Sequence, residues 1–364
     1  MSLDETFHKT HSPLYDRAPP FPRKHRLKLH AFLLGQTGTP TIDTREIYRD
    51  LVEDTQAAQE WGYDCAWFAE HHFSNYVLVP NSLTLIAALS RETDRIRLGT
   101  AIVLLPLRNP TYVAEEIAMV DQLSEGRLNV GFGRGYQPYE FDQLGIDFEQ
   151  AGSRLADGLD LVTHFFTKRD QPFASAHANA SGFTLTPSCR QTPHPPFWVA
   201  CGSRQSMGMA LDRGCNVIIN VGHHGPKVAD QMLQVFEEEC AVRSIERKKI
   251  RFGLQMHAGL VENDEQRQVA LRSAAYLHRM QVRLRERRAR IVEGVVDTSG
   301  SEKTEPTYDE WSSGCMVGDP RHIERQMSRF RTMGVDDLLL TYRFGEFTTE
   351  GTRRSMKFIA ECSQ

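Results

Sequence analysis

Strand-like and helix-like segments alternate along this 364-residue chain from residue 27 almost to its end. Short runs of β-branched and other apolar residues precede longer segments whose apolar residues recur at helical spacing. We expect strands at 27–34, 63–69, 96–104, 128–133, 196–200, 215–220, 250–260 and 337–342. We expect helices at 44–61, 81–91, 110–123, 153–166, 203–213, 226–243, 262–288, 321–333 and 349–360.

Eight strands separated by helices, without a break in composition, predict a single α/β domain over residues 27–364. The fold class that fits best is a (β/α)8 TIM barrel with insertions, and a doubly wound parallel sheet is the alternative. Residues 1–26 have several prolines and neither pattern, which predicts an N-terminal arm. Residues 171–196 are predicted to be an excursion before the fifth strand. The long polar stretch 291–318 is predicted to be a lid or binding loop.

Composition narrows the possible partners. A formal net charge of -4 gives no electrostatic reason to expect nucleic acid or an anionic membrane as a partner. No apolar run approaches the roughly 20 residues of a membrane span. The chain has seven cysteines and no C-x-x-C pair, which favours reduced thiols and a cytoplasmic location. The run of arginines between residues 283 and 290 is interpreted as a solvated face rather than a phosphate site.

Polar residues follow several of the predicted strands, where barrel enzymes carry their active sites. Glu70-His71-His72 follows the second strand, and Arg134 follows the fourth between two glycines. Gly202-Ser203 opens the helix after the fifth strand and would offer free backbone N–H groups to an anion. A structural histidine pair and a tight turn with an exposed arginine remain alternatives. Histidine pairs also occur at 71–72 and 223–224, but adjacent strand residues point to opposite faces, so no metal site is predicted.

Several longer segments resemble the bacterial luciferase-like, flavin-dependent monooxygenases. Similar stretches run from Trp61 to Phe73, from Leu98 to Pro106 with Asn109-Pro110, and from Val120 to Gly135. Two more, Pro196–Ser203 and Val317–Pro320, match in position and character. The resemblance covers about residues 27–345 and implies a barrel that binds reduced FMN at the carboxyl ends of its strands.

In this family, FMN reduced by a separate NAD(P)H:flavin reductase reacts with O2 to a C4a-hydroperoxide, which oxygenates a small organic substrate. Carried over by position, His71 resembles the active-site histidine and Arg134 the arginine that holds the FMN phosphate. Ala101-Ile102 matches a non-prolyl cis peptide under the flavin ring. The residues that match the end of strand five, with backbone contacts to ring and phosphate, are Ala200, Cys201, Gly202 and Ser203. The stretch 291–318 corresponds to the family's mobile lid.

Two positions depart from the luciferases. Cys201 stands where luciferases have glutamate, and Gly133 stands where the catalytic luciferase subunit has a reactive cysteine. Both changes favour a luciferase-like monooxygenase of another substrate over a light-emitting, aldehyde-oxidising enzyme. An F420-dependent hydride-transfer enzyme of the same superfamily is one alternative, and a non-catalytic partner subunit is another. The presence of His71 and Arg134 favours catalysis. The helices at 81–91 and 110–123 carry the family's dimer contact, so we expect a homodimer.

Overall fold

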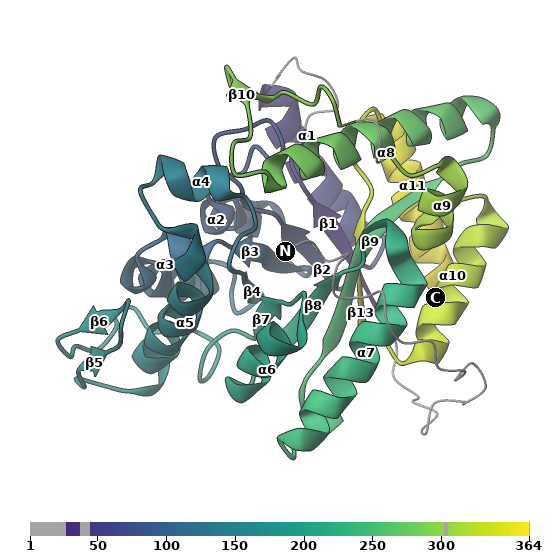
Figure 1. Cartoon of the computed structure of the whole chain (residues 1–364). Helices are drawn as coiled ribbons and strands as arrows, with labels where there is room; N and C mark the ends of the chain where they lie inside the picture. The colour runs from purple at the N-terminus through teal and green to yellow at the C-terminus, as the bar shows by residue number, and fades with distance from the viewer. Residues whose placement is uncertain (1–26, 37–43, 302–304, 364) are drawn as a thin grey trace.

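The computed structural model describes residues 27–36, 44–301 and 305–363. The predicted N-terminal arm, 1–26, lies outside the described residues. Eight parallel strands pair side by side in the order β9-β13-β1-β2-β3-β4-β7-β8, and a further pairing of β8 with β9 closes them into a barrel (Figure 1). The strands are β1 (Lys28–Leu33), β2 (Cys65–Phe68), β3 (Arg97–Val103), β4 (Leu128–Phe132), β7 (Phe197–Ala200), β8 (Asn216–Asn220), β9 (Phe252–Leu260) and β13 (Asp337–Thr341). The prediction of a (β/α)8 barrel is therefore confirmed, and the doubly wound sheet is wrong.

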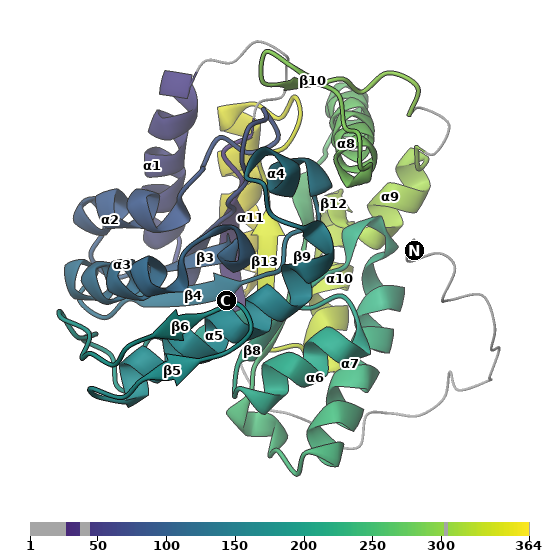
Figure 2. The same ribbon diagram turned by 60° about the vertical axis from the view of Figure 1, so that its left-hand side comes forward.

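An outer ring of helices covers the barrel (Figures 1 and 2). Its members in the described chain are α1 (Thr44–Glu60), α2 (Ser82–Glu92), α3 (Pro110–Leu123), α5 (Ala151–Thr167), α6 (Arg204–Asp212), α7 (Gly225–Val242), α10 (Pro320–Met333) and α11 (Thr349–Ser363). Side-chain caps determine where two of these helices begin. The Asn81 side chain caps α2 by accepting a hydrogen bond from the backbone of Thr84, and Asn109 caps α3 ahead of Pro110.

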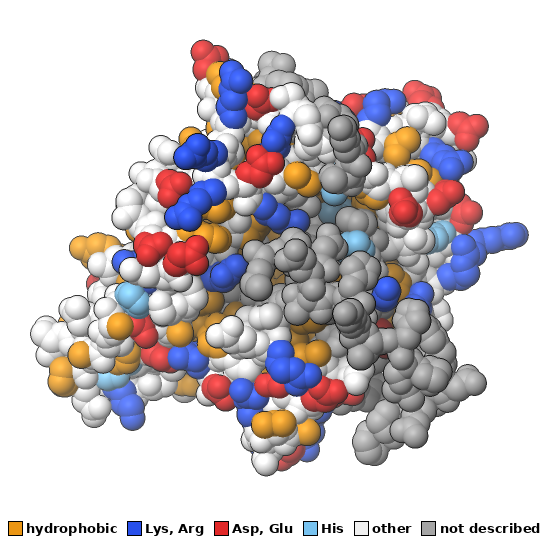
Figure 3. Space-filling view, in the orientation of Figure 1, with side chains coloured by type: hydrophobic (Ala, Val, Ile, Leu, Met, Phe, Trp, Pro, Cys, Tyr) orange, Lys and Arg blue, Asp and Glu red, His pale blue; other side chains and the backbone are white. Residues whose placement is uncertain are grey.

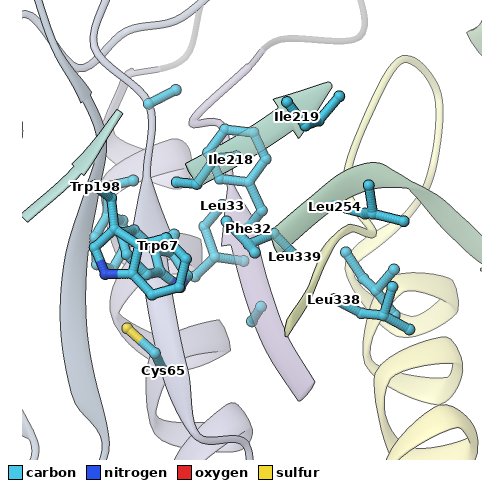
Figure 4. Packing of buried hydrophobic residues seen from close by; sticks show 14 of the residues in the cluster. Phe32, Leu33, Cys65, Trp67, Trp198, Ile218, Ile219, Leu254, Leu338 and Leu339 are labelled. Atoms are coloured by element: carbon cyan, nitrogen blue, oxygen red, sulfur yellow. The ribbon is translucent and has the colours of Figure 1, made fainter. Parts of the chain in front are cut away.

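The barrel interior is a packed core, in which strand residues of β2, β4, β9 and β13 are buried along their whole length. This burial explains why these strands are mostly apolar on both faces rather than alternating, with Asn129, Gln255 and His257 among the exceptions. Trp67 and Trp198 lie edge to face with their ring centroids 5.5 Å apart (Figure 4). Gly99 lies under the Trp67 ring, so close that a Cβ atom there would come within 2.4 Å of it. A glycine on β3 thus makes room for the largest side chain of the core.

Three insertions lie over one end of the barrel (Figures 1 and 2). They are α4 (Pro138–Gln143), α8 (Asp264–Arg285) and the hairpin formed by β10 (Ile291–Val292) and β11 (Val295–Val296). The polar stretch 291–318 therefore has secondary structure, and it also contains α9 (Tyr308–Gly314) and β12 (Met316–Gly318), which pairs with the end of β9.

The excursion at 171–196 contains one small antiparallel hairpin, β5 (Phe173–Ala174) with β6 (Asn179–Ala180). Residues 183–185 of the excursion are not part of a strand.

On the molecular face in Figure 3, basic and acidic side chains are interspersed rather than gathered by sign. Among the described residues, no helix is both long enough and apolar enough to cross a bilayer. All seven cysteines are free thiols.

The close contact at Gly99 predicts a large effect of one methyl group. Gly99→Ala is expected to lower the free energy of unfolding by about 1–3 kcal/mol, because the added Cβ must displace Trp67. Gly152→Ala is the matched control, since a Cβ there meets nothing within 4 Å. Because Gly152 lies in helix α5, we expect unchanged stability or a gain of up to about 1 kcal/mol. Urea unfolding followed by tryptophan fluorescence measures both. Equal stability of the two variants would contradict the packing described.

Candidate functional site

Glu70, which follows β2, joins three elements at the mouth of the barrel. Its carboxylate is buried and accepts hydrogen bonds from the backbone N–H and the hydroxyl of Ser82, at 3.0 and 2.7 Å. The other oxygen accepts from the backbone N–H of Leu104, at 3.1 Å. Glu70 thus ties the end of β2 to the start of α2 and the end of β3. Its position at a helix N-terminus also suits its negative charge.

His71 lies against α4 with most of its ring covered. Its side chain is 11% exposed. The ring atom Nδ1 lies 3.0 Å from Oε1 of Glu140 and 3.0 Å from Nε2 of Gln137. The rings of Tyr76 and Tyr136 flank it at centroid distances of 5.1 and 5.4 Å. Among the described residues, no hydrogen bond reaches the other ring nitrogen, Nε2.

His72 has different neighbours from His71. Its backbone N–H donates to Oε1 of Glu140 at 2.7 Å, and its ring lies 5.5 Å from that of Phe73. Its Nε2 atom is buried without a partner in the described chain. Burial lowers the pKa of His72, although the Glu140 and Glu70 carboxylates oppose the shift. This histidine is neutral near pH 7, and its contacts are those of a structural residue.

The Ala101–Ile102 peptide bond is cis, as the family resemblance implied. Both residues are partly exposed, although they lie within a barrel strand. The register between β3 and β4 shifts beside them, between Thr100 and Val103. Gly133 faces this segment, and a Cβ there would lie 1.8 Å from Cδ1 of Ile102. The glycine found where the catalytic luciferase subunit has cysteine therefore accommodates the Ile102 side chain.

Arg134 follows β4 with an exposed side chain. Its guanidinium lies 5.6 Å from the centroid of the Phe148 ring. In the described part of the chain, no carboxylate forms an ion pair with it. Gly135 has a φ of 78°, a conformation that suits glycine, and turns the chain toward α4. An unpaired guanidinium on a fixed turn can bind a phosphate or carboxylate in a bidentate way.

The segment from Ala200 to Ser203 leaves β7 and enters α6. Ala200, Gly202 and Ser203 are exposed, whereas Cys201 is buried, and burial raises the pKa of its thiol to about 12. Cys201 is therefore a thiol rather than a thiolate near neutral pH. A Cβ on Gly202 would meet nothing within 4 Å.

The expectation of free N–H groups at Gly202 and Ser203 is wrong. The hydroxyl of Ser206 accepts from both, at 3.2 and 3.1 Å, and the hydroxyl of Ser203 accepts from the backbone of Ser206. This reciprocal cap satisfies the backbone N–H groups of Gly202, Ser203 and Ser206. An anion bound to the N–H groups of Gly202 and Ser203 would have to replace the Ser206 hydroxyl.

The structure thus brings together the ends of β2, β3 and β4. His71 contacts Tyr136, two residues after Arg134, and Gly133 lies against Ile102. The sequence reasoning missed three residues: Tyr76, Gln137 just before α4, and Glu140 on α4. A six-residue helix is too short to be predicted from its periodicity. A glutamate beside the apolar residues Phe141 and Leu144 was nevertheless a signal of a buried carboxylate. Within the described residues, no group of three or more His, Cys, Asp or Glu side chains could hold a metal ion.

Comparison with known proteins agrees with this architecture. The family model described as luciferase-like monooxygenase matches residues 27–337. The oxygenase component of flavin-dependent trigonelline monooxygenase from Acinetobacter baylyi is 27% identical over 300 residues, covering 80% of this chain and 82% of that protein. The alkanal monooxygenase alpha chain of the Kryptophanaron alfredi symbiont is 28% identical over 194 residues, covering 53% of this chain and 54% of that one.

Solved structures share the fold. The monooxygenase RslO1 from Streptomyces bottropensis superposes with a TM-score of 0.78 at 22% identity, covering 92% of this chain and 98% of that one. An F420-dependent secondary alcohol dehydrogenase gives 0.74 at 13% identity, with coverage of 93% and 99%. The oxygenating constituent of 3,6-diketocamphane monooxygenase from Pseudomonas putida, solved with FMN, gives 0.73 at 16%, with coverage of 92% and 97%. On the family match over most of its length, this chain belongs to the luciferase-like monooxygenases.

Proposed function

We propose that this protein is the oxygenase of a two-component system. It would take reduced FMN from a separate NAD(P)H:flavin reductase and, with O2, transfer one oxygen atom to a small organic substrate through the flavin C4a-hydroperoxide that the family implies. The observation that carries the proposal is a largely covered histidine after β2 together with an unpaired arginine after β4, on the two strands that flank β3. The relative from Acinetobacter baylyi is named as the oxygenase component of its enzyme, which supports a separate reductase partner.

The residues at the barrel mouth fit FMN. Arg134 offers a guanidinium that no described carboxylate neutralises, which suits the phosphate. Ala101 and Ile102 are partly exposed on β3 and would support the planar ring. Ala200, Gly202 and Ser203 are exposed at the end of β7, where Gly202 lets a ligand approach the backbone. Cys201 would contribute its backbone only, because its thiol is buried.

His71 is the proposed catalytic residue. Its ring is held between two tyrosine rings and the α4 carboxylate, with Nε2 unbonded within the described chain. A histidine fixed in this way can accept or donate a proton at Nε2 without a change in the orientation of its ring. Most of its surface is covered, which excludes bulk water and strengthens electrostatic interactions at the ring.

Two alternatives have weaker support. F420-dependent enzymes share this fold, but their sequence identities of 13% and 16% support a common fold and not a common cofactor. A non-catalytic partner subunit is disfavoured because the catalytic luciferase-like residues His71 and Arg134 are both present.

Asn75 attaches the proposed lid, residues 291–318, to the histidine loop, which is the segment between β2 and α2 that carries His71. This buried side chain accepts from the backbone of Val296 and donates to the hydroxyl of Tyr276 on α8, each at 3.0 Å. Its backbone N–H donates to the carbonyl of Gly294 at 2.7 Å. The next residue, Tyr76, touches the His71 ring. A closed lid would therefore stabilise the wall of the site, and an open lid would release it.

The proposed homodimer would use α2 and α3. Three large apolar side chains of α3, Tyr112, Met119 and Leu123, are exposed. Their spacing places Tyr112, Met119 and Leu123 along one side of the helix. An exposed apolar stripe of this kind is typical of a protein interface.

The proposal predicts that Arg134 controls FMN affinity. Arg134→Ala is expected to weaken binding of reduced FMN about 10- to 100-fold, because a hydrogen bond to a charged group contributes about 1.5–3 kcal/mol. Anaerobic titration followed by protein fluorescence measures the Kd. Arg95→Ala is the control, since Arg95 is exposed and precedes β3, at the opposite end of the barrel. Unchanged affinity in Arg134→Ala would argue against the assigned phosphate site.

His71 is predicted to be required for oxygen transfer. The protein is incubated with FMN, NADH, a flavin reductase and 18O2 in extract of the source cells, and mass spectrometry identifies the metabolite that gains one 18O atom. His71→Ala is expected to lower its yield at least about 100-fold, while oxygen is still consumed and appears as hydrogen peroxide. A labelled yield equal to that of the unmodified protein would exclude the role.

Asn75 is predicted to hold the lid. Asn75→Ala is expected to raise hydrogen exchange at residues 291–296 and to increase hydrogen peroxide release several-fold. The reason is that the variant loses two side-chain hydrogen bonds, from the backbone of Val296 and to the hydroxyl of Tyr276, and keeps only the backbone hydrogen bond to Gly294. Tyr48→Phe is the control, since the Tyr48 hydroxyl donates to the carbonyl of Leu78 in the same loop and, among the described residues, forms no hydrogen bond with the hairpin. Equal exchange in the two variants would show that Asn75 does not anchor the hairpin.

A further inference from the structure

The Nδ1 atom of His71 faces two partners that make opposite demands on it. The Glu140 carboxylate can only accept a hydrogen bond when ionised, and the amide nitrogen of Gln137 can only donate one. Both lie 3.0 Å from this nitrogen. A single Nδ1 atom either carries a proton or offers a lone pair, so only one of these two contacts is a hydrogen bond at a time.

Several observations favour Glu140. Its side chain is 0% exposed, and its only ion-pair partner in the described chain is His71. The same oxygen also accepts from the backbone N–H of His72, which fixes its position. Hydrogen bonds to an ionised acceptor are about twice as strong as those between neutral groups. A buried carboxylate without arginine or lysine beside it strongly favours a proton on the facing imidazole nitrogen.

Gln137 can adapt where Glu140 cannot. Its side chain is buried, and its Oε1 atom has no partner among the described residues. Rotation of the amide by half a turn exchanges Oε1 and Nε2, which occupy nearly the same space. In that orientation Oε1 becomes a second acceptor for the Nδ1 proton. The demand of Glu140 can thus be met while the Gln137 amide stays in contact with Nδ1.

We infer that Glu140 is a positioning residue that holds the Nδ1 proton of His71 and thereby presents the Nε2 lone pair to the reacting molecules. With His71 in this tautomer, Nε2 can take a proton from an acidic group of a bound molecule, which becomes its conjugate base, and later return it. The Glu140 carboxyl, which faces Nδ1, stabilises the imidazolium that forms. The tautomer of His71 does not depend on the proposed function. Only the role of this proton transfer in the oxygenation reaction rests on it.

The other groups around His71 do not compete for Nδ1. Tyr76 and Tyr136 present ring contacts, and burial raises the pKa of Tyr136, which keeps its hydroxyl neutral. Arg285 of α8 lies on the Tyr136 ring, 5.7 Å from its centroid, one layer away from the histidine. Glu140 is therefore the only described carboxylate that bonds to the His71 ring.

The tautomer is measured directly on the full-length protein without cofactor. With 15N-labelled histidine, the nitrogen chemical shifts of the His71 ring distinguish Nδ1–H from Nε2–H, and the signal is assigned by its loss in His71→Ala. The unmodified protein is expected to show Nδ1–H. Glu140→Met is expected to show Nε2–H, because Gln137 then donates to the bare Nδ1. Gln137→Met should keep Nδ1–H. An Nε2–H signal in the unmodified protein would overturn the inference, even if Glu140→Met does not fold.

Activity gives a second readout. Glu140→Gln keeps the shape of the side chain and removes its charge, so the labelled-product yield is expected to fall at least about tenfold, with FMN affinity unchanged. Glu140→Asp is expected to restore most of the yield. Full yield in Glu140→Gln would contradict the positioning role. Failure of the proposed function would appear instead as absence of FMN binding by the unmodified protein, with the tautomer result unaffected.

Discussion

The closure of the parallel barrel is the constraint on which the site depends. Because all eight strands run in the same direction and β8 pairs with β9, their carboxyl ends meet at one rim. Residues that are far apart in sequence, such as His71 and Glu140, therefore come within hydrogen-bond distance. The core that maintains closure is packed tightly enough for Gly99 to be required beneath Trp67. Packing at the centre of the barrel thus determines where the side chains of the candidate site lie at its mouth.

Two buried carboxylates organise that rim. Glu70 joins β2, β3 and the start of α2 through three hydrogen bonds. Glu140 joins the histidine loop to α4 through the His71 ring and the His72 backbone. A buried carboxylate is costly unless it accepts hydrogen bonds, so each loop conformation is stabilised by the partners that it brings to the charge. The two carboxylates thus hold the loop that carries His71 in place, Glu70 against β3 and α2 and Glu140 against α4.

The sequence predicted the barrel well because its long elements carry clear periodicity. The α3 helix was predicted with the observed bounds, Pro110–Leu123, since Asn109 and Pro110 mark its start. Short elements such as α4 and β12 were missed, because six or three residues show no period. The cap by Ser206 was also missed, although a serine three residues after Ser203 is a recognisable signal. The role of Glu140 depends on a contact across 69 residues, which no local pattern contains.

Binding of cofactor by the unmodified protein tests the central claim most directly. Anaerobic titration of the full-length chain with reduced FMN, and separately with reduced F420, gives two dissociation constants under the same conditions. The account predicts that reduced FMN binds at least about tenfold more tightly, a difference of about 1.4 kcal/mol. Tighter binding of F420, or no saturable binding of FMN, would contradict it.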